Sequence, residues 1–581
     1  MTGEATVARL LADLDARGIR LRADGDNLRL DGPRGALDAD LLGRLKAGKT
    51  AILEHLRATG AGRVPPAAPR DWYPLSAAQE RLYFNQLLTP DSLDYHIVDV
   101  FQVGDRVDAA TLERALRTVV RRHDGLRTAF DLIDGEARQR IDSTAELVLE
   151  TTDEPGFDPA DPAAFLRPFD LTRPPLLRAG LVRAGSRRYL LLDVHHLVFD
   201  GASRATFAAD LAHAYRGEQQ EPLPVGYPDF AVWQRAEDTP DLIRMRRYWQ
   251  QLMDPPSPVP GPARTAHPGL SRTDDRQAHL DLDDAELVAG LRRLCRAEGV
   301  TPFMALLAAY VVLLRGMAGR DEVVVGFPVD VRADAGLARN VGLFINTVPI
   351  RVFPTAQWSF RDLLRAVRDQ VVQALDNCQY PYDRIVGDAS ARRNLKSDPL
   401  VDGFFNYAAV DGGAAGALAG IGLSDQPRAP HAALPELPCL AARFDLTLSA
   451  LAGEHGFGLD LQCMTAMFDS ATVGRLAGQV RQIVEQAVAD PGRPLGPAAP
   501  EPATDRSAGV EQRVRDIVGE ILGIAAPELD DDFFAVGGHS LLAAKLVVRI
   551  DRELGVRIPI DDFLGDSTLR RLSELVRAGA G

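Results

Sequence analysis

Two adjacent histidines, His195 and His196, are followed by Asp200 and Gly201 in the string HHLVFDG. The string comes directly after the apolar run 189–194, which predicts a buried strand, and before a helical pattern. A histidine at a strand end can act near neutral pH as a general base or as a hydrogen-bond donor. A nearby carboxylate can fix the ring, and glycine permits a tight turn. Taken alone, the short string favours a histidine that is satisfied within a turn.

A serine able to carry chemistry, Ser540, lies in the string DFFAVGGHSLL over residues 532–542. Helical patterns cover residues 511–522 and 541–554, so the Gly-Gly pair presents Ser540 at a helix start. Serine is a favoured N-cap there, and the same position suits a phosphate ester because a helix N-terminus attracts anions. The string by itself therefore leaves a helix cap and a modified serine as alternatives.

The bulk composition limits the classes of protein to which the chain can belong. Its 581 residues exceed the roughly 250–300 at which a single core stops growing, so we expect several domains. A hydrophobic fraction of 46% and a charged fraction of 25% are ordinary for a globular protein. The formal net charge of −15 argues against a nucleic-acid partner, which would require clustered basic residues.

Cysteine usage and hydropathy predict a cytoplasmic protein without metal sites or membrane spans. The four cysteines are far apart, form no C-x-x-C pair and are expected to be reduced: Cys295, Cys378, Cys439 and Cys463. The longest apolar run, 303–314, is shorter than the roughly 20 residues needed to span a bilayer and predicts a buried helix. The N-terminus lacks the apolar region of a signal peptide.

Stretches rich in Ala, Pro and Gly at 57–70 and 489–509 predict linkers, and the Pro-rich stretch 255–268 predicts a division inside the middle block. The block itself mixes expected helices, such as 110–121 and 360–375, with strands, such as 323–329. The predicted domains are 1–58, 71–488 with lobes of about 71–254 and 270–488, and 510–578.

Seven segments of the middle block, in order, resemble the core motifs of condensation domains of nonribosomal peptide synthetases. They are LSAAQERL (75–82), RHDGLRTAF (122–130), HHLVFDG (195–201), YPDFAVWQ (227–234), VGLFINTVPIR (341–351), NCQYPYD (377–383) and RFDLTL (443–448). The resemblance implies a two-lobed fold similar to chloramphenicol acetyltransferase, with a tunnel between the lobes. A donor acyl thioester would enter from one face and an acceptor nucleophile from the other.

The resemblance also implies roles for individual residues. His196 would face the tunnel and position or deprotonate the attacking amine, while Asp200 would form a structural ion pair with Arg332. Gly201 would place its N–H near the developing oxyanion, or serve the turn alone. Asn346 would belong to a loop across the tunnel, with a supporting role as the alternative. Whether His196 is a true base stays open, because holding two tethered reactants together can supply much of the catalysis.

The sequence departs from the family pattern at three places. Segment 377–383 lacks the usual His-Gln pair, Asp124 replaces a common Glu, and Ala202 replaces a frequent Trp. These changes put substrate preference in doubt more than activity. Heterocyclisation domains carry an aspartate in place of the first histidine, and epimerisation domains follow their carrier, so His195 and the domain order favour condensation.

Residues 510–576 resemble peptidyl carrier proteins, which are four-helix bundles whose motif serine carries 4′-phosphopantetheine. By this resemblance Ser540 is the modification site, and a phosphopantetheinyl transferase is an expected partner. His539, Leu541 and Leu542 would help partner proteins recognise the helix.

The N-terminal block combines a helical pattern over 5–14, a hairpin pattern over 19–30 and a second helical pattern over 39–56. This small α/β order resembles docking domains of the tubulysin-synthetase type, which accept a peptide tail from an upstream subunit by strand addition. A plain folded extension is the alternative. The basic residues Arg20, Arg22 and Arg29 would favour an acidic tail, although a solvated strand face explains them nearly as well.

Together these features predict a multidomain α+β subunit with the order docking, condensation, carrier. A donor on an upstream carrier would be joined to an aminoacyl group on Ser540, forming an amide. No adenylation signature or G-x-S-x-G elbow appears, so an adenylation enzyme acting in trans is expected. The alternatives are an ester-forming or free-amine-capturing enzyme, and a silent platform that displays a carrier-bound substrate to tailoring enzymes.

Overall fold

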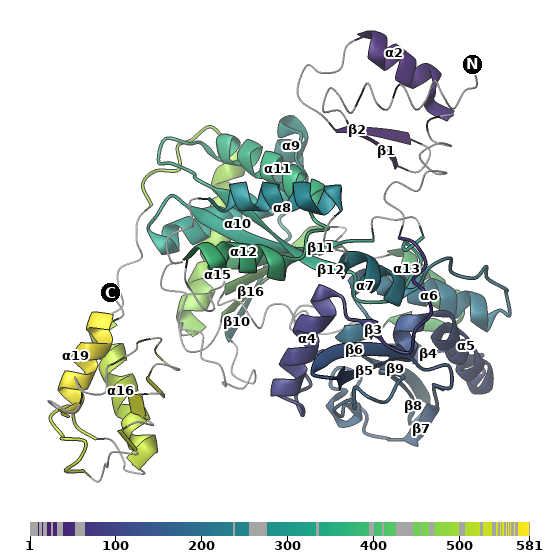
Figure 1. Cartoon of the computed structure of the whole chain (residues 1–581), viewed down its shortest axis with the longest axis horizontal. Coiled ribbons are helices and arrows are strands. Elements are labelled where there is room, and N and C mark those ends of the chain that lie inside the picture. The colour runs from purple at the N-terminus through teal and green to yellow at the C-terminus, as the bar shows by residue number, and fades with distance from the viewer. Residues whose placement is uncertain are drawn as a thin grey trace.

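A computed structural model of the chain describes most of residues 64–498 and parts of residues 10–52 and 506–579 (Figure 1). The gaps within 64–498 are 236–238, 255–275, 333–335, 394–399, 410–411, 426–445, 454 and 464–469. The expected division at 255–268 therefore lies outside the described residues. The helix expected over 5–14 is described only at Leu10 and Leu14, which are both helical and buried.

The first lobe is built on a five-stranded sheet in the order β14-β4-β9-β8-β7 and a three-stranded sheet in the order β3-β6-β5. Its strands are β3 (Tyr73–Pro74), β4 (His96–Val103), β5 (Thr128–Ile133), β6 (Glu136–Ile141), β7 (Leu149–Asp153), β8 (Leu177–Ala184), β9 (Arg187–His195) and β14 (Leu423–Asp425). Its helices are α4 (Ala77–Leu88), α5 (Ala109–Arg122), α6 (Gly201–Tyr215) and α7 (Tyr227–Arg235), with short 3₁₀ turns η1 (Asp124–Arg127), η2 (Ala163–Phe165) and η3 (His196–Val198).

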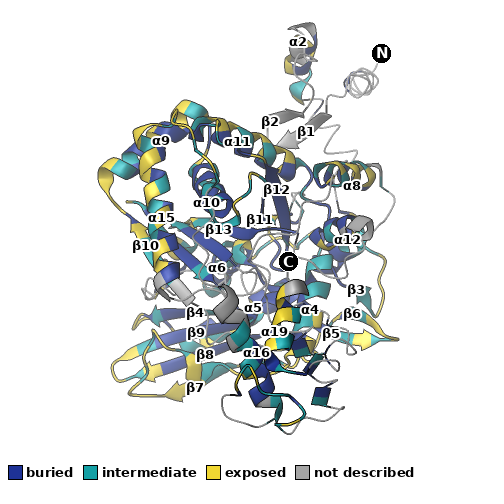
Figure 2. Ribbon diagram, turned by 90° about the vertical axis from the view of Figure 1, so that its left-hand side faces the viewer, coloured by how far each residue is buried: buried dark blue, intermediate teal, exposed yellow. Residues whose placement is uncertain are grey.

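The second lobe is a six-stranded sheet in the order β10-β16-β15-β13-β11-β12. The strands are β10 (Arg276–Leu282), β11 (Val323–Asp330), β12 (Ile345–Val352), β13 (Gly403–Ala409), β15 (Leu446–Ala452) and β16 (Phe457–Cys463). The helices are α8 (Pro240–Leu252), α9 (Ala285–Glu298), α10 (Pro302–Ala318), α11 (Phe360–Asp376), α12 (Tyr382–Arg393) and α15 (Ser470–Ala489). Helix α13 (Gly412–Ala419) packs instead on α6 of the first lobe. Figure 2 shows the buried strands β11 and β12 and helix α11, which packs on β12 and exposes part of its surface.

Helix α10 illustrates how local sequence sets an element. Thr301 caps its N-terminus by accepting a hydrogen bond from the N–H of Met304, and Pro302 occupies the first turn. Gly319 ends the helix in the left-handed conformation, with φ of 63°. In the described part of the chain no single helix is long and apolar enough to cross a membrane, and only α9 with α10, bent by 101°, passes that test as a pair.

The two lobes exchange segments. The described residues 331–332 and 336–344, which follow β11 of the second lobe, bury Val331, Val341 and Phe344 in the core of the first lobe. Strand β14 likewise pairs with β4 of the first lobe. In the opposite direction, α8 packs into the core of the second lobe through Trp249, although the expected division places it in the first. We call residues 331–344 the crossing segment.

The phenol of Tyr227 fastens the crossing segment to the first lobe. Its hydroxyl donates to the carbonyl of Leu343 at 2.7 Å, so the 2.8 Å contact with Ser76 Oγ has the serine as donor. Both contacts are buried, and burial raises the pKa of Tyr227. The ring of Tyr227 also packs edge-on against Phe344, with ring centroids 4.7 Å apart.

The small terminal units have their own elements. Near the N-terminus, β1 (Arg20–Asp24) and β2 (Asn27–Asp31) form an antiparallel hairpin in which Asp24 pairs with Asn27, followed by α2 (Ala39–Ala47). Near the C-terminus, α16 (Arg506–Leu522) lies beside α19 (Leu569–Gly579) (Figure 1). They share a core that includes Ile517, Phe533, Leu546 and Leu572.

We predict that Tyr227→Phe lowers the free energy of unfolding by about 1–3 kcal/mol, because the buried carbonyl of Leu343 loses its donor. Urea unfolding followed by tryptophan fluorescence measures this. All four tryptophans, Trp72, Trp233, Trp249 and Trp358, lie within residues 64–498, so the signal reports on the two lobes. Tyr215→Phe is the control, because its hydroxyl accepts only an exposed contact from the N–H of Asp108. Equal losses in both variants would contradict the prediction.

Candidate active site

His195 ends strand β9, where it is paired with His96 of the neighbouring strand β4. Its Nδ1 accepts from the N–H of Leu197 at 3.1 Å, so its Nε2 carries the proton and faces Gln86 Oε1 at 3.4 Å. Burial, followed by the neighbouring His96 and His196, lowers the pKa of His195 well below its ordinary value. His195 is thus a neutral, hydrogen-bonded support for the loop that follows.

His196 differs from His195 because one of its ring nitrogens has no partner. Its Nδ1 lies 2.5 Å from the carbonyl oxygen of Phe199, so Nδ1 is the protonated donor. Nε2 therefore carries a lone pair, and it is buried without a hydrogen-bond partner. Burial lowers the pKa of His196, with the contact to Phe199 opposing that shift, and the ring stays neutral. An imidazole nitrogen of this kind can accept a proton or a hydrogen bond.

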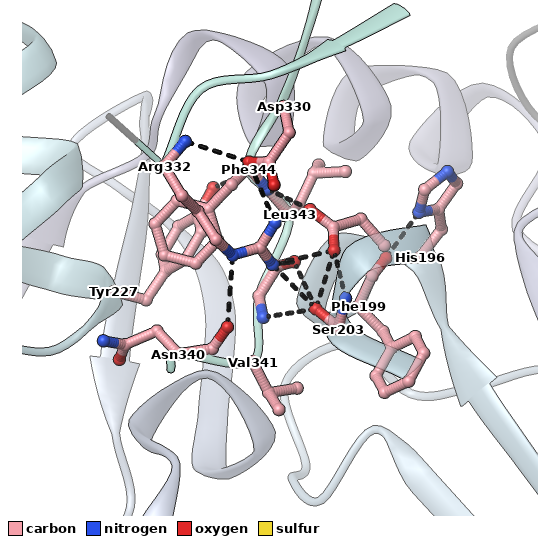
Figure 3. A network of polar contacts seen from close by, with 12 residues as sticks. His196, Phe199, Ser203, Tyr227, Asp330, Arg332, Asn340, Val341, Leu343 and Phe344 are labelled. Carbon is pink, nitrogen blue, oxygen red and sulfur yellow. Dashed lines mark hydrogen bonds and ion pairs between the residues drawn. The ribbon is translucent and has the colours of Figure 1, made fainter. Parts of the chain in front are cut away.

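Asp200 caps helix α6 and anchors a buried network (Figure 3). One carboxylate oxygen accepts from the N–H of Ser203 at 2.8 Å, from Ser203 Oγ at 2.7 Å and from Arg332 Nη2 at 2.8 Å. The other accepts from Arg332 Nη1 at 2.9 Å and from the N–H of Phe344 at 2.7 Å. Figure 3 shows His196 at the edge of this network, with its ring turned away from Arg332. Asp200 is therefore structural in the geometry observed.

The guanidinium of Arg332 is held on all sides. It also donates to the carbonyls of Asn340 and Gly342, at 3.2 Å each, and lies over the ring of Phe344 with 4.3 Å to the centroid. Burial opposes its charge, yet Asp200 and Asp330 outweigh burial and raise the pKa of Arg332. The pair joins the first lobe, which contains Asp200, to the crossing segment, which contains Arg332. The two residues are 132 positions apart in the sequence.

Two further residues from the sequence analysis have clear positions. Gly201 is the first residue of α6, and it is not among the described glycines with positive φ, so the chain reverses there without left-handed backbone. Asn346 lies in strand β12 rather than in a loop, because its backbone pairs with Val329. Its side chain donates to the carbonyls of Cys378 and Tyr380 and accepts from the N–H of Tyr382. Asn346 therefore holds segment 377–383 against the second lobe.

Arg81 and His123 belong to motif segments of the sequence analysis, but the sequence did not predict which groups they contact. Arg81 of α4 lies 3.8 Å from Asp383 of α12 and thus links the two lobes, and its charge contributes to lowering the pKa of His196, after the larger effect of burial. His123 donates from Nε2 to Asp210 and accepts the N–H of Val341 at Nδ1. The motif segments 75–82 and 122–130 indicated these residues, whereas only the folded chain shows which groups they meet.

The expected carrier serine, Ser540, lies outside the described residues. The segments on both sides of it are described: Phe533 and Ala543 are buried in the C-terminal core. Asp532 orders the preceding turn by accepting the N–H groups of Phe534 and Ala535 at 3.0 Å each. Among the described residues, no group of histidine, cysteine and acidic side chains could hold a metal ion.

Comparison with protein families decides the assignment. A model of the condensation domain matches residues 69–499. The chain belongs to the condensation domain family. A model of the phosphopantetheine attachment site matches residues 512–576, and a model of the TubC N-terminal docking domain matches residues 7–58. The predicted order of docking, condensation and carrier domains is confirmed, and so is 4′-phosphopantetheine as the covalent cofactor of the carrier domain.

The curated relatives are much longer than this chain. Bacitracin synthase 3 of Bacillus licheniformis is 32% identical over 449 residues, which cover 76% of this chain and 7% of that protein. Tyrocidine synthase 2 of Brevibacillus parabrevis is 33% identical over 451 residues, covering 76% of this chain and 12% of that protein. The condensation and carrier domains thus belong to the context of nonribosomal peptide synthetases, of which this chain spans a small part.

Solved structures support the fold class. The X-domain from teicoplanin biosynthesis superimposes with a TM-score of 0.63 and 24% identity, over 74% of this chain and 98% of that one. At this identity the likeness shows the fold alone. The expected two-lobed condensation fold is confirmed.

We predict that Arg332→Met lowers the free energy of unfolding of the condensation domain by about 3–5 kcal/mol, because it leaves the Asp200 carboxylate buried without its cation. Urea unfolding measures the change. Arg339→Met is the matched control: it removes an exposed arginine from the same crossing segment. A loss below about 1 kcal/mol in Arg332→Met would show that the ion pair is not needed.

The lowered pKa of His195 makes the stability of the folded protein depend on pH. Since the folded state holds this ring neutral, the unfolded chain binds the extra proton, and stability falls as pH drops below about 6.5. We expect His195→Asn to make that fall shallower by up to about 1.4 kcal/mol per pH unit. Urea unfolding between pH 7.5 and 5 measures it, with His213→Asn, on the partly exposed side of α6, as control. If the free energy of unfolding falls equally steeply with pH in wild type and in His195→Asn, the result would contradict a neutral His195 in the folded state.

Proposed function

We propose that this chain is a condensation enzyme that joins a donor acyl or peptidyl thioester, delivered by an upstream carrier, to the amine of an aminoacyl group on Ser540. The observation that carries the proposal is the buried, unpartnered Nε2 of His196. In a folded domain such a nitrogen is a loss of stability unless another molecule uses it.

Nε2 of His196 is suited to accept the proton that the acceptor amine loses. Its neutral ring, fixed by the bond from Nδ1 to the carbonyl of Phe199, directs the lone pair of Nε2. As the amine nitrogen bonds to the thioester carbonyl carbon, it becomes positively charged, and Nε2 accepts the proton that it must lose. The carbon–sulfur bond then breaks, and the departing sulfur takes a proton. His196 acts here by positioning the amine as well as by accepting its proton.

Other groups complete the site. The N–H of Gly201, in the first turn of α6, has no acceptor within the helix and is proposed to stabilise the developing oxyanion. His196 is fully buried, so the reactants must displace side chains that cover it. The weak contact between Arg81 and Asp383, which spans the lobes, is proposed to open when they enter.

The carrier and docking domains support a proposal for the partners of this reaction. When bound to Ser540, 4′-phosphopantetheine supplies the thiol that holds the acceptor as a thioester. A phosphopantetheinyl transferase installs it, and an adenylation enzyme acting in trans charges it. The hairpin formed by β1 and β2 is proposed to add a strand from the tail of an upstream subunit. These partners and the net charge of −15 suit a cytoplasmic assembly.

Intact-protein mass spectrometry tests the proposal with the pantetheinylated chain, a loaded upstream carrier and an adenylation partner. We expect wild type to gain the joined donor and acceptor mass, and Ser540→Ala to gain none. His196→Ala should slow product formation by about 10²–10⁴-fold, the range for a positioned acid–base group. His213→Ala is the matched histidine control.

The other outcomes each identify an alternative. Product released from a soluble amine or alcohol, with Ser540→Ala as active as wild type, would replace the proposal by free-amine capture or ester formation. A carrier charged with acceptor alone, in both wild type and His196→Ala, would identify a platform that displays its substrate to tailoring enzymes.

A further inference from the structure

A cavity of about 600 Å³ lies on the first lobe, outside the catalytic string. Its walls come from the end of α5, from η1, from residues 218–226 after α6 and from Asn340 of the crossing segment. Its volume lies within the roughly 300–1,000 Å³ typical of small-molecule sites. Three arginines line it: Arg121, Arg122 and Arg127.

Two of these arginines have nitrogens that the protein leaves unsatisfied. Arg122 donates from Nε to Asp210 at 2.9 Å and from Nη1 to the carbonyl of Glu221 at 2.7 Å, yet its Nη2 is buried without a partner. Its side chain is 9% exposed. Arg127 donates from Nη2 to Asp124, and its Nε is likewise buried without a partner. Both nitrogens are donors that are closed to solvent in this structure, so acceptor oxygens of a bound molecule reach them only after the side chains around them move.

The acidic side chains of the cavity do not cancel these donors. Asp124 is held by Arg127 at 2.6 Å, and Glu218 lies 3.6 Å from His213 and 3.9 Å from Arg216. Arg121 is exposed at the rim and forms no ion pair with the described part of the chain. The cavity thus combines an exposed cation at its rim with two arginine side chains in its wall, each of which keeps one buried nitrogen without a partner, in a chain whose net charge is −15.

We propose that this cavity binds a small polyanion, a metabolite that carries two or more phosphate or carboxylate groups. Guanidinium forks match the geometry of both groups. The site shares a wall with the catalytic support network, because the carbonyl of Asn340 accepts from Arg332 Nε at 3.2 Å. An anion in the cavity therefore contacts the same segment that pairs with Asp200. The binding itself does not depend on the condensation activity.

Isothermal titration calorimetry of the full chain with pyrophosphate and with citrate, at about 50 mM salt so that charges are weakly screened, tests the site. We expect saturable binding of at least one probe. Binding of pyrophosphate alone would identify phosphate esters as the ligand class, and binding of citrate alone would identify polycarboxylates. The absence of saturable binding of either probe up to about 10 mM would overturn the proposal.

Arg121→Glu should weaken binding at least about tenfold, because it reverses the charge at the rim. It is preferred to a change at Arg122, which would leave Asp210 without its cation. Arg114→Glu is the matched control, since it makes the same charge change at an exposed position of α5 that does not line the cavity. Equal weakening in both variants would show general charge attraction and overturn the site.

Discussion

The buried carboxylate of Asp200 imposes the constraint around which the two lobes are arranged. A charge in a dry interior is tolerated only when it is paired and its remaining lone pairs accept hydrogen bonds. Asp200 meets this condition with donors from α6 and from the crossing segment, namely Ser203, Arg332 and Phe344. The loop 196–200 is therefore held in place only while the crossing segment lies on the first lobe.

The same burial governs the chemistry of the two histidines. Both rings are neutral because the interior disfavours their charged forms, and hydrogen bonds select their tautomers. His195 has contacts at both nitrogens, whereas Nε2 of His196 has no partner. Burial also hides that nitrogen, so a site of this design must open to admit its reactants. Stability of the closed lobes and access to His196 oppose each other.

A reaction between two carrier-bound groups makes modest demands on the residues that catalyse it. The carriers supply a high effective concentration, and the protein has to orient the amine and remove a proton. In the proposed mechanism one unpartnered histidine, His196, meets these demands. Other polar side chains serve to hold the lobes together. The tie made by Tyr227 is an example, because it joins the first lobe to the crossing segment.

Much of the local structure could be predicted because it depends on neighbours along the chain. The apolar run 303–314 lies within α10, and the hairpin expected over 19–30 is present as β1 and β2. The string HHLVFDG was correctly placed at a strand end. These features follow from periodicity, caps and turn residues, which act over a few residues. The pairing of Asp200 with Arg332 was expected only from the family resemblance, since 132 residues separate them.

Tertiary contacts alone decided the remaining features. The lobe to which α8 belongs, the crossing of residues 331–344 and the position of Asn346 in a strand all depend on packing between distant segments. The free Nε2 of His196 and the unsatisfied donors of Arg122 and Arg127 are likewise visible only in the fold. A sequence specifies which groups exist, but whether a buried group finds a partner depends on the whole set of side chains that surround it.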